Sequence, residues 1–296
     1  MQALRTPTAR FDQLSDYPFS PNYCDVGDGL QMHYVDEGPK EAAPILLLHG
    51  EPSWSYLYRK MIPILNTGQY RVIAPDLIGF GKSDKPLEKT AYTYQSHLNW
   101  LSHLISQLDL QGINLFCQDW GGLLGLRILT EQPERFARVV VANTFLPTGA
   151  RKASDAFLQW QHFSQTAPEF PVGNVLDMAT ISTLTPEVKA AYDAPFPDES
   201  YKAGARQFPI LVPIEESDPE AIKNRAAWKK LENWDKPMLT LFSDSDPITR
   251  GGDQVFQKLV PGAKGQAHQV IEQAGHFLQE DKGEEIARLV LAFIEQ

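Results

Sequence analysis

The chain has 296 residues, of which 43% are hydrophobic, and it carries a formal net charge of −10 with an isoelectric point near 5.2. This length and composition are sufficient for one sizeable core, and they favour one large domain with an insertion over two equal domains. The acidic balance argues against nucleic acid or an anionic membrane as the main partner.

The two cysteines, Cys24 and Cys117, lie far apart in the sequence and indicate neither a disulfide framework nor a metal site. Residues 1–7 lack the apolar core of a signal peptide, and no apolar run approaches the roughly 18 residues of a membrane helix. We therefore expect a cytoplasmic protein without a metal or another cofactor, and by default a monomer.

Strand and helix patterns alternate along the first half of the chain. Residues 1–28 are polar with scattered aromatic anchors, so we expect an arm packed on the body. The alternation at 30–36 is typical of a half-buried strand, and the apolar run 45–48 is typical of a parallel strand covered on both faces. Further strands are expected at 71–76, 113–116 and 139–143, with helices at 56–65, 96–108 and 123–129.

The alternation breaks between residues 147 and 226. This segment contains several prolines and no run with the pattern of a parallel strand, so we expect a mostly helical lid. Strand patterns resume at 238–242 and 268–271, and a closing helix is predicted at 285–294. The whole pattern predicts an α/β fold with a mostly parallel, doubly wound sheet. Its core is expected to comprise residues 1–146 and 227–296, and its lid residues 147–226.

The stretch Cys-Gln-Asp-Trp-Gly-Gly at 117–122 lies between an apolar strand and a helical pattern. A strand that turns sharply into a helix through glycines is the setting of a nucleophile elbow, whose tip is usually serine. Here the tip is Asp119. A carboxylate attacks without first losing a proton to a base, and it forms an ester with the carbon that it attacks. We therefore predict that Asp119 is a nucleophile, although an aspartate after a strand is often only a helix cap.

An acid and a histidine follow Asp119 in the order that hydrolases of this fold use. Asp246 follows one predicted strand and His276 follows the next, so both are expected at the carboxyl edge of the sheet. Asp244 competes with Asp246 as the acid, and Pro247 favours Asp246 because it marks the exit from strand to loop. The remaining histidines have no catalytic context and are expected to be structural: His33, His49, His97, His103, His162 and His268.

Two backbone N–H groups are expected to stabilise an oxyanion, those of Glu51 in the loop 49–52 and of Trp120 next to the nucleophile. The predicted reaction then has two steps. Asp119 displaces a leaving group from an sp³ carbon. His276, oriented by Asp246, next takes a proton from the water that attacks the carbonyl carbon of Asp119.

Three motifs are similar to those of haloalkane dehalogenases in the α/β-hydrolase superfamily. They are His-Gly-Glu-Pro-Ser-Trp at 49–54, Asp-Leu-Ile-Gly-Phe-Gly-Lys-Ser-Asp-Lys-Pro at 76–86 and Gln-Asp-Trp-Gly-Gly at 118–122. The resemblance covers nearly the whole chain, including residues 5–7 and the lid stretch 194–198, and these motifs are specific to the dehalogenase and epoxide hydrolase branches.

This resemblance implies an α/β-hydrolase fold and a function. The expected reaction converts a small halogenated aliphatic substrate into a primary alcohol, a halide ion and a proton. Asp119 would be the nucleophile, His276 the base and Asp246 the acid.

Glu51 resembles one dehalogenase subfamily in particular, in which two tryptophan indoles hold the halide; another subfamily has asparagine at this position. The resemblance implies that Trp120 is the first halide donor and that Trp160, in the lid, is the second. An indole N–H suits a leaving halide because it donates a hydrogen bond and has no competing acceptor. The other four tryptophans are expected to be structural: Trp54, Trp100, Trp228 and Trp234.

Three alternatives remain at this point. An epoxide hydrolase would share the fold, the aspartate and the histidine, and would use lid tyrosines such as Tyr192 and Tyr201 to protonate an alkoxide; Trp160 would then have no role. A fluoroacetate-type dehalogenase would need arginines near the elbow, and residues 121–124 provide none. A protein that only binds a ligand would not need the three residues of the triad.

Overall fold

The computed structural model describes all residues from 1 to 296, and it contains one large sheet of eight strands in the order β10-β9-β8-β7-β4-β5-β3-β2. The strands of this sheet are β2 (Asn22–Asp25), β3 (Gln31–Glu37), β4 (Ala43–Leu48), β5 (Tyr70–Pro75), β7 (Ile113–Gln118), β8 (Phe136–Ala142), β9 (Met238–Ser243) and β10 (Gln269–Ile271). Only the pairings of β2 with β3 and of β3 with β5 are antiparallel; all the others are parallel. The prediction of a mostly parallel α/β sheet is therefore confirmed.

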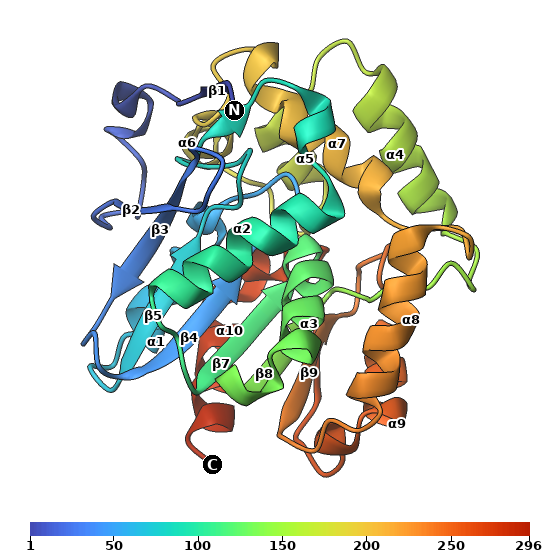
Figure 1. Cartoon of the computed structure of the whole chain (residues 1–296). Coiled ribbons are helices and arrows are strands. Elements are labelled where there is room, and N and C mark those ends of the chain that lie inside the picture. The colour runs from blue at the N-terminus through green and yellow to red at the C-terminus, as the bar shows by residue number, and fades with distance from the viewer.

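Helices cover both faces of the sheet. The ten α-helices are α1 (Ile62–Leu65), α2 (Tyr94–Gln107), α3 (Trp120–Glu131), α4 (Asp155–Thr166), α5 (Val172–Met178), α6 (Pro186–Asp193), α7 (Ala203–Leu211), α8 (Pro219–Leu231), α9 (Gly252–Leu259) and α10 (Leu278–Ile294). In Figure 1, α2 and α3 lie in front of the strands and α10 lies behind them. With both faces covered, β7 and β9 are buried along their whole length, which explains their largely apolar sequence.

Two predicted helices differ from the structure. The helix expected at 56–65 is instead a 3₁₀ turn, Ser55–Tyr58, followed by the short α1. Pro63 lies in the first turn of α1, where its missing N–H is tolerated, but it could not donate in the middle of a longer helix. The closing helix begins at Leu278 rather than at residue 285, and its polar first turns, interrupted by non-helical dihedrals at Lys282, hide the apolar period.

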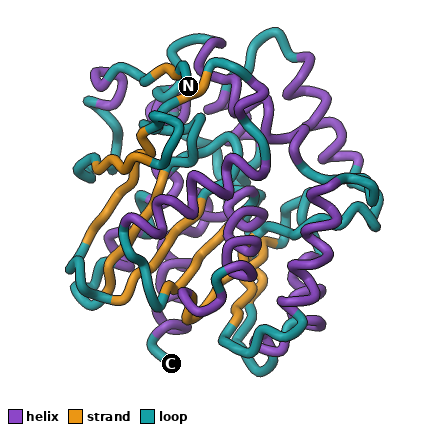
Figure 2. Tube along the Cα trace, viewed as in Figure 1, coloured by secondary structure: helices purple, strands orange, loops and turns teal.

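The segment 147–226 contains no strand, and its helices α4 to α7 gather above the sheet in Figures 1 and 2. Helix α8 begins inside this segment but packs against α3 of the core, where Arg127 donates hydrogen bonds to Glu220 (3.0 Å) and Asn224 (2.9 Å). The predicted end of the lid at residue 226 therefore falls within a helix that lies on the core.

The N-terminal arm lies against the lid. Its strand β1 (Ala3–Leu4) pairs with β6 (Lys85–Pro86), and the hydroxyl of Thr6 donates a hydrogen bond to the backbone carbonyl of Pro195 (2.6 Å). None of the helices combines the length and the hydropathy needed to cross a membrane.

Candidate active site

Asp119 occupies the tight turn between β7 and α3. Its backbone dihedrals are φ 50° and ψ −126°, a conformation that a residue with a side chain adopts only when its surroundings enforce it. Gly121 and Gly122 allow this turn because a Cβ atom at either position would lie about 2 Å from the Leu48 carbonyl or the Thr144 hydroxyl. The turn directs the carboxylate of Asp119 away from the sheet, as the nucleophile-elbow hypothesis requires.

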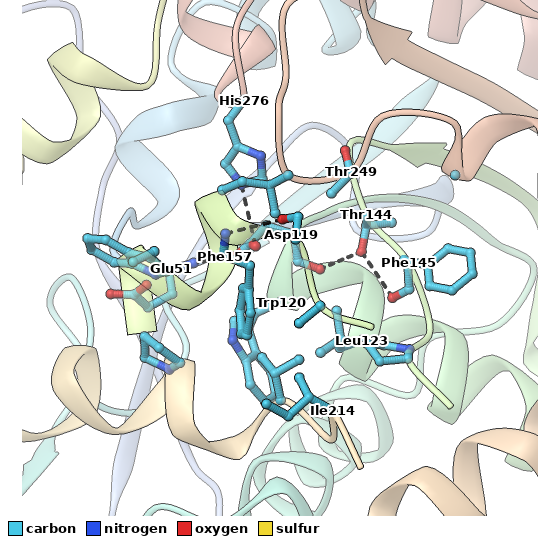
Figure 3. A pocket seen from close by; sticks show the side chains of 18 of the residues that line it. Glu51, Asp119, Trp120, Leu123, Thr144, Phe145, Phe157, Ile214, Thr249 and His276 are labelled. Carbon is cyan, nitrogen blue, oxygen red and sulfur yellow. Dashed lines mark hydrogen bonds and ion pairs between the residues drawn. The ribbon is translucent and has the colours of Figure 1, made fainter. Parts of the chain in front are cut away.

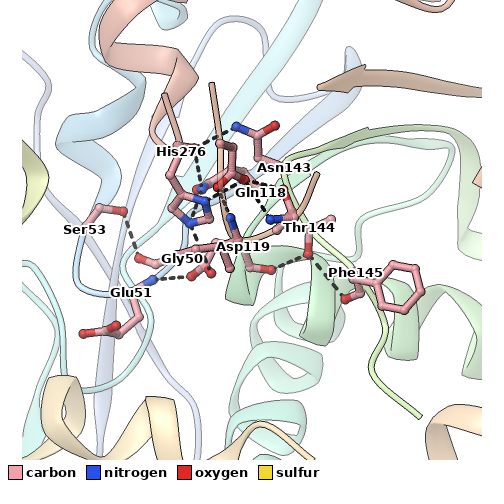
Figure 4. Close-up of polar contacts among 12 residues, drawn as sticks. Gly50, Glu51, Ser53, Gln118, Asp119, Asn143, Thr144, Phe145 and His276 are labelled. Carbon is pink, nitrogen blue, oxygen red and sulfur yellow. Dashed lines mark hydrogen bonds and ion pairs between the residues drawn. The ribbon is translucent and has the colours of Figure 1, made fainter. Parts of the chain in front are cut away.

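The two carboxylate oxygens of Asp119 have different partners. Oδ1 accepts a hydrogen bond from the backbone N–H of Glu51 (2.8 Å), whereas Oδ2 lies 3.4 Å from Nε2 of His276. Gly50 makes this arrangement possible because a Cβ atom there would lie 2.2 Å from Oδ1. Figure 4 shows the loop of Gly50 and Glu51 on one side of the carboxylate and Thr144 on the other. The N–H of Trp120 makes no hydrogen bond to the carboxylate, and its role as second oxyanion donor stays a prediction.

His276 lies between two carboxylates. Its Nδ1 is 3.0 Å from Oδ2 of Asp246, which also accepts a hydrogen bond from the Thr249 hydroxyl, while Oδ1 accepts from the Ile248 N–H (2.8 Å). Asp244 is exposed and instead accepts from the backbone N–H groups of residues 273 and 274. The geometry therefore places Asp246, and not Asp244, in contact with the histidine.

The charges of this group are strongly coupled. Burial disfavours the charge of Asp246, yet the attraction of His276 and the donors around the carboxylate lower the pKa of Asp246 to about 2. Burial also disfavours a positive His276, but the charge of Asp246 and the hydrogen bond with Asp119 outweigh it and raise the pKa of His276 to about 10. In the resting state the site therefore contains an imidazolium between two carboxylates.

Two residues that the sequence did not single out hold the histidine in place. The amide of Asn143, at the end of β8, donates hydrogen bonds to the backbone carbonyls of Gly275 and His276 (both 3.0 Å). The amide of Gln118 donates to the same His276 carbonyl at 3.2 Å and lies 3.3 Å from Nε2 of the ring. Their position at the carboxyl ends of strands was a signal that could have identified them.

A cavity of about 420 Å³ opens from the triad toward the surface. Figure 3 shows Asp119 between His276 and Trp120 at its inner end, with Leu123 and Ile214 beyond the indole. Apolar side chains from the core and the lid form most of the wall. This shape suits a small apolar substrate whose reacting carbon approaches the carboxylate.

The indole N–H groups of the six tryptophans fall into two sets. Trp120 and Trp160 both line the cavity, and neither donates a hydrogen bond to a backbone carbonyl. Three others donate to the protein and lie outside the cavity: Trp54 to Ala191 (3.3 Å), Trp100 to Asp28 (3.2 Å) and Trp228 to Leu146 (2.8 Å). Trp234 is buried away from the cavity. The two tryptophans predicted to bind halide are thus the two whose donors can reach a ligand.

The side chain of Glu51 adds a second carboxyl group near the nucleophile. Burial and the negative charge of Asp119 raise the pKa of Glu51 well above its usual value, and the indole of Trp160 partly opposes this shift. The raised pKa favours the neutral form of Glu51, which reduces the repulsion of a departing anion.

The lid tyrosines of the epoxide hydrolase hypothesis do not reach the cavity. Tyr192 is fully buried, and its hydroxyl donates to Glu280, which also forms an ion pair with Arg59. Neither Tyr192 nor Tyr201 lines the cavity. Nowhere in the chain do three or more His, Cys, Asp or Glu side chains form a group that could hold a metal ion.

The sheet, the sharp turn at Asp119 and the contacts of His276 with two carboxylates have the arrangement of an α/β hydrolase. In agreement, a family model described as the α/β-hydrolase fold matches residues 43–283. The chain is 58% identical to a haloalkane dehalogenase of Psychrobacter cryohalolentis, over 99% of this chain and 98% of that protein. It is 50% identical to a haloalkane dehalogenase of Mycolicibacterium paratuberculosis, with the same shares of the two chains aligned.

The solved structures agree with these relatives. The tetrameric haloalkane dehalogenase DpaA from Paraglaciecola agarilytica NO2 superimposes with a TM-score of 0.91 at 40% identity, over 99% of this chain and 98% of that one. The protein belongs to the haloalkane dehalogenase family of α/β hydrolases, and it catalyses hydrolytic dehalogenation.

Proposed function

We propose that the protein hydrolyses haloalkanes through a covalent alkyl ester on Asp119. The observation that carries this proposal is the asymmetry of the Asp119 carboxylate. Oδ1 is held by the N–H of Glu51, so Oδ2 is the oxygen that remains available to attack a carbon in the cavity. Attack by Oδ2 forms a C–O bond while the carbon–halogen bond breaks, and the bonding pair leaves with the halide.

The leaving halide gains its negative charge inside an apolar cavity. We propose that the indole N–H groups of Trp120 and Trp160 stabilise that charge, because both line the cavity without a carbonyl partner. With this assignment, we infer that the protein belongs to the subfamily with two tryptophan donors.

The second step regenerates the carboxylate. Water attacks Cγ of Asp119, and His276, positioned by Asp246, takes one proton from that water. The negative charge of the tetrahedral intermediate develops on Oδ1, which already accepts a hydrogen bond from Glu51. We propose the N–H of Trp120 as the second donor at this stage. Collapse of the intermediate breaks the bond between Cγ and the alkyl oxygen, and the remaining hydroxyl proton passes to that oxygen as the alcohol leaves. His276 keeps the proton taken from water, which restores the resting site.

Alkylation of Asp119 also prepares the base. The resting His276 carries a proton because two carboxylates flank it, and formation of the ester removes one of these charges. The pKa of His276 then falls, which favours loss of its proton and lets the neutral histidine accept another proton from water. In this proposal the first step switches on the base that the second step needs.

The His276→Phe variant tests the two-step mechanism. With excess 1-bromohexane we expect about one equivalent of bromide per enzyme and no turnover. Intact-mass spectrometry should show an increase equal to the alkyl group minus one hydrogen, located on Asp119. An Asp244→Asn control should turn over normally, because Asp244 does not contact the histidine. A wild-type enzyme that turns over while the variant forms no adduct would contradict the ester mechanism. A diol formed from 1,2-epoxyhexane instead of bromide release would support the epoxide hydrolase alternative.

All residues of the proposed mechanism come from one chain. We therefore propose that a monomer is sufficient for catalysis, which activity measured across a size-exclusion profile can test. The cytoplasmic location inferred from the sequence stays a prediction.

A further inference from the structure

The rim of the active-site cavity is cationic, although the chain as a whole carries an excess of ten negative charges. Three exposed cationic residues line the cavity: Arg151, Lys152 and Arg250. Met178 is the only other exposed residue of the lining. None of these cations forms an ion pair. Arg250 donates only to the backbone carbonyl of Asp244 (3.2 Å). Their charges are therefore available to a ligand that enters the cavity.

The carboxyl groups of the cavity are less exposed than these cations. Glu51 and Asp119 are the only carboxyl groups in the lining, and the raised pKa of Glu51 favours its neutral form. The lining also contains apolar side chains, Phe145, Phe157 and Ile214 among them. The cavity therefore offers a ligand a nucleophile, apolar side chains and unpaired cations.

We propose that the substrates of this enzyme include ω-halogenated alkanoates, whose carboxylate stays at the rim while the halogenated end reaches Asp119. This inference rests on the proposed dehalogenation at that residue. The alkyl chain leaves water along the apolar wall, which favours binding with each methylene group. The carboxylate remains solvated at the rim, where Arg151, Lys152 and Arg250 attract it at no cost of burial.

The same geometry excludes short halo acids. An α-halo carboxylate would carry its negative charge one carbon from the reacting centre, next to Asp119. The one cation beside Asp119 is His276, which is already flanked by Asp119 and Asp246, and the other cations of the lining are exposed. A spacer between the halogen and the carboxylate is therefore required.

The expected gain is moderate. Exposed charges interact weakly in water, and neighbouring carboxylates on Asp155 and Glu215, which are exposed but do not line the cavity, reduce the field at the rim. We expect each cation to raise kcat/KM for the carboxylate substrate about two- to threefold, so the three together give about a tenfold effect. Added salt should weaken this effect.

The experiment compares kcat/KM for 6-bromohexanoate with that for the neutral 6-bromohexan-1-ol at low ionic strength. In the triple variant Arg151→Gln, Lys152→Gln and Arg250→Gln, we expect the ratio of the two values to fall about tenfold, while turnover of the alcohol stays within about twofold. Added sodium sulfate should lower the wild-type ratio in the same direction. Bromoacetate should be a poor substrate of every form.

A matched control separates the rim from the overall charge. The variant Lys89→Gln, Lys258→Gln and Lys264→Gln removes three exposed cations that do not line the cavity, and its ratio should equal that of the wild type. The inference is overturned if the rim variant keeps the wild-type ratio, if both triple variants lower it equally, or if the bromo alcohol reacts and 6-bromohexanoate does not. In all three cases turnover of the alcohol leaves the proposed function intact. Failure of every bromoalkane to release bromide would instead refute the proposed function itself.

Discussion

Asp119→Asn gives a direct measure of the electrostatic switch at His276. Asparagine has nearly the shape of aspartate but no charge, so at this position it imitates the alkylated nucleophile. The variant should lower the pKa of His276, because Asp246 then remains as its only carboxylate partner. The sign follows from the charge: removing a negative neighbour disfavours the positive imidazolium.

The magnitude can be worked out from the distance. Two unit charges separated by the 3.4 Å between Nε2 of His276 and Oδ2 of Asp119 interact by about 5 kcal/mol at an effective dielectric constant of about 20, an upper limit of about 3 to 4 pKa units. The side chain of Asp119 is 21% exposed to the cavity, so solvent weakens this interaction. We therefore expect a fall of about 2 units, from about 10 in the wild type to about 8 in the variant.

The assay is an NMR titration of ¹⁵N-labelled histidine. The resonance of His276 is assigned by its loss in His276→Phe, and the other six histidines serve as internal references. Asp244→Asn is the matched control, because it removes an exposed carboxylate that does not contact the ring. An unchanged pKa in Asp119→Asn would refute the reasoning, as would an equal shift in the control.

Two further predictions concern the lid. Trp160→Phe should weaken bromide binding about tenfold, because a hydrogen bond to a charged group is lost. Fluorescence quenching by bromide measures this change. Trp228→Phe should not weaken bromide binding, because the N–H of Trp228 donates to a backbone carbonyl. Asp281→Ala should lower the free energy of unfolding in urea by about 1 to 3 kcal/mol, since this carboxylate accepts backbone hydrogen bonds from residues 181–182 of the lid. The exposed Glu284 provides the control, and an equal loss in Glu284→Ala would argue against this role for Asp281.

The sheet was predictable because its strands have one strong signature. A parallel strand covered on both faces is nearly continuously apolar, and residues 45–48 and, apart from Thr240, residues 238–242 have that pattern. The segment 56–65 was mispredicted because its apolar residues follow tertiary packing rather than a helical period, and Pro63 interrupts it. The start of α10 was missed since Glu280 is polar yet fully buried, paired with Arg59 from a distant part of the chain. No local pattern reports such a partner.

The triad was predictable for a different reason. Asp119, Asp246 and His276 each follow a predicted strand, and the topology of a parallel sheet brings the ends of its strands to one edge. The structure was needed to choose between Asp244 and Asp246. The two residues are only two positions apart, yet Asp246 contacts the histidine and Asp244 is exposed to solvent. The roles of Asn143 and Gln118 depend on where their amides point, which sequence spacing does not determine.

The charges of the site give a physical reason for proposing indoles, rather than cationic side chains, as the halide donors. A lysine or arginine beside Asp119 would pair with the carboxylate and lower its reactivity as a nucleophile. It would also hold the product anion strongly in a cavity of low polarity and delay its release. The indole N–H of Trp120 and of Trp160 has neither effect, because it is neutral and donates only a hydrogen bond. Apart from His276, the cations that line the cavity are exposed, and solvent screens them from Asp119. This separation allows the inner end to be reactive and the entrance to attract anions.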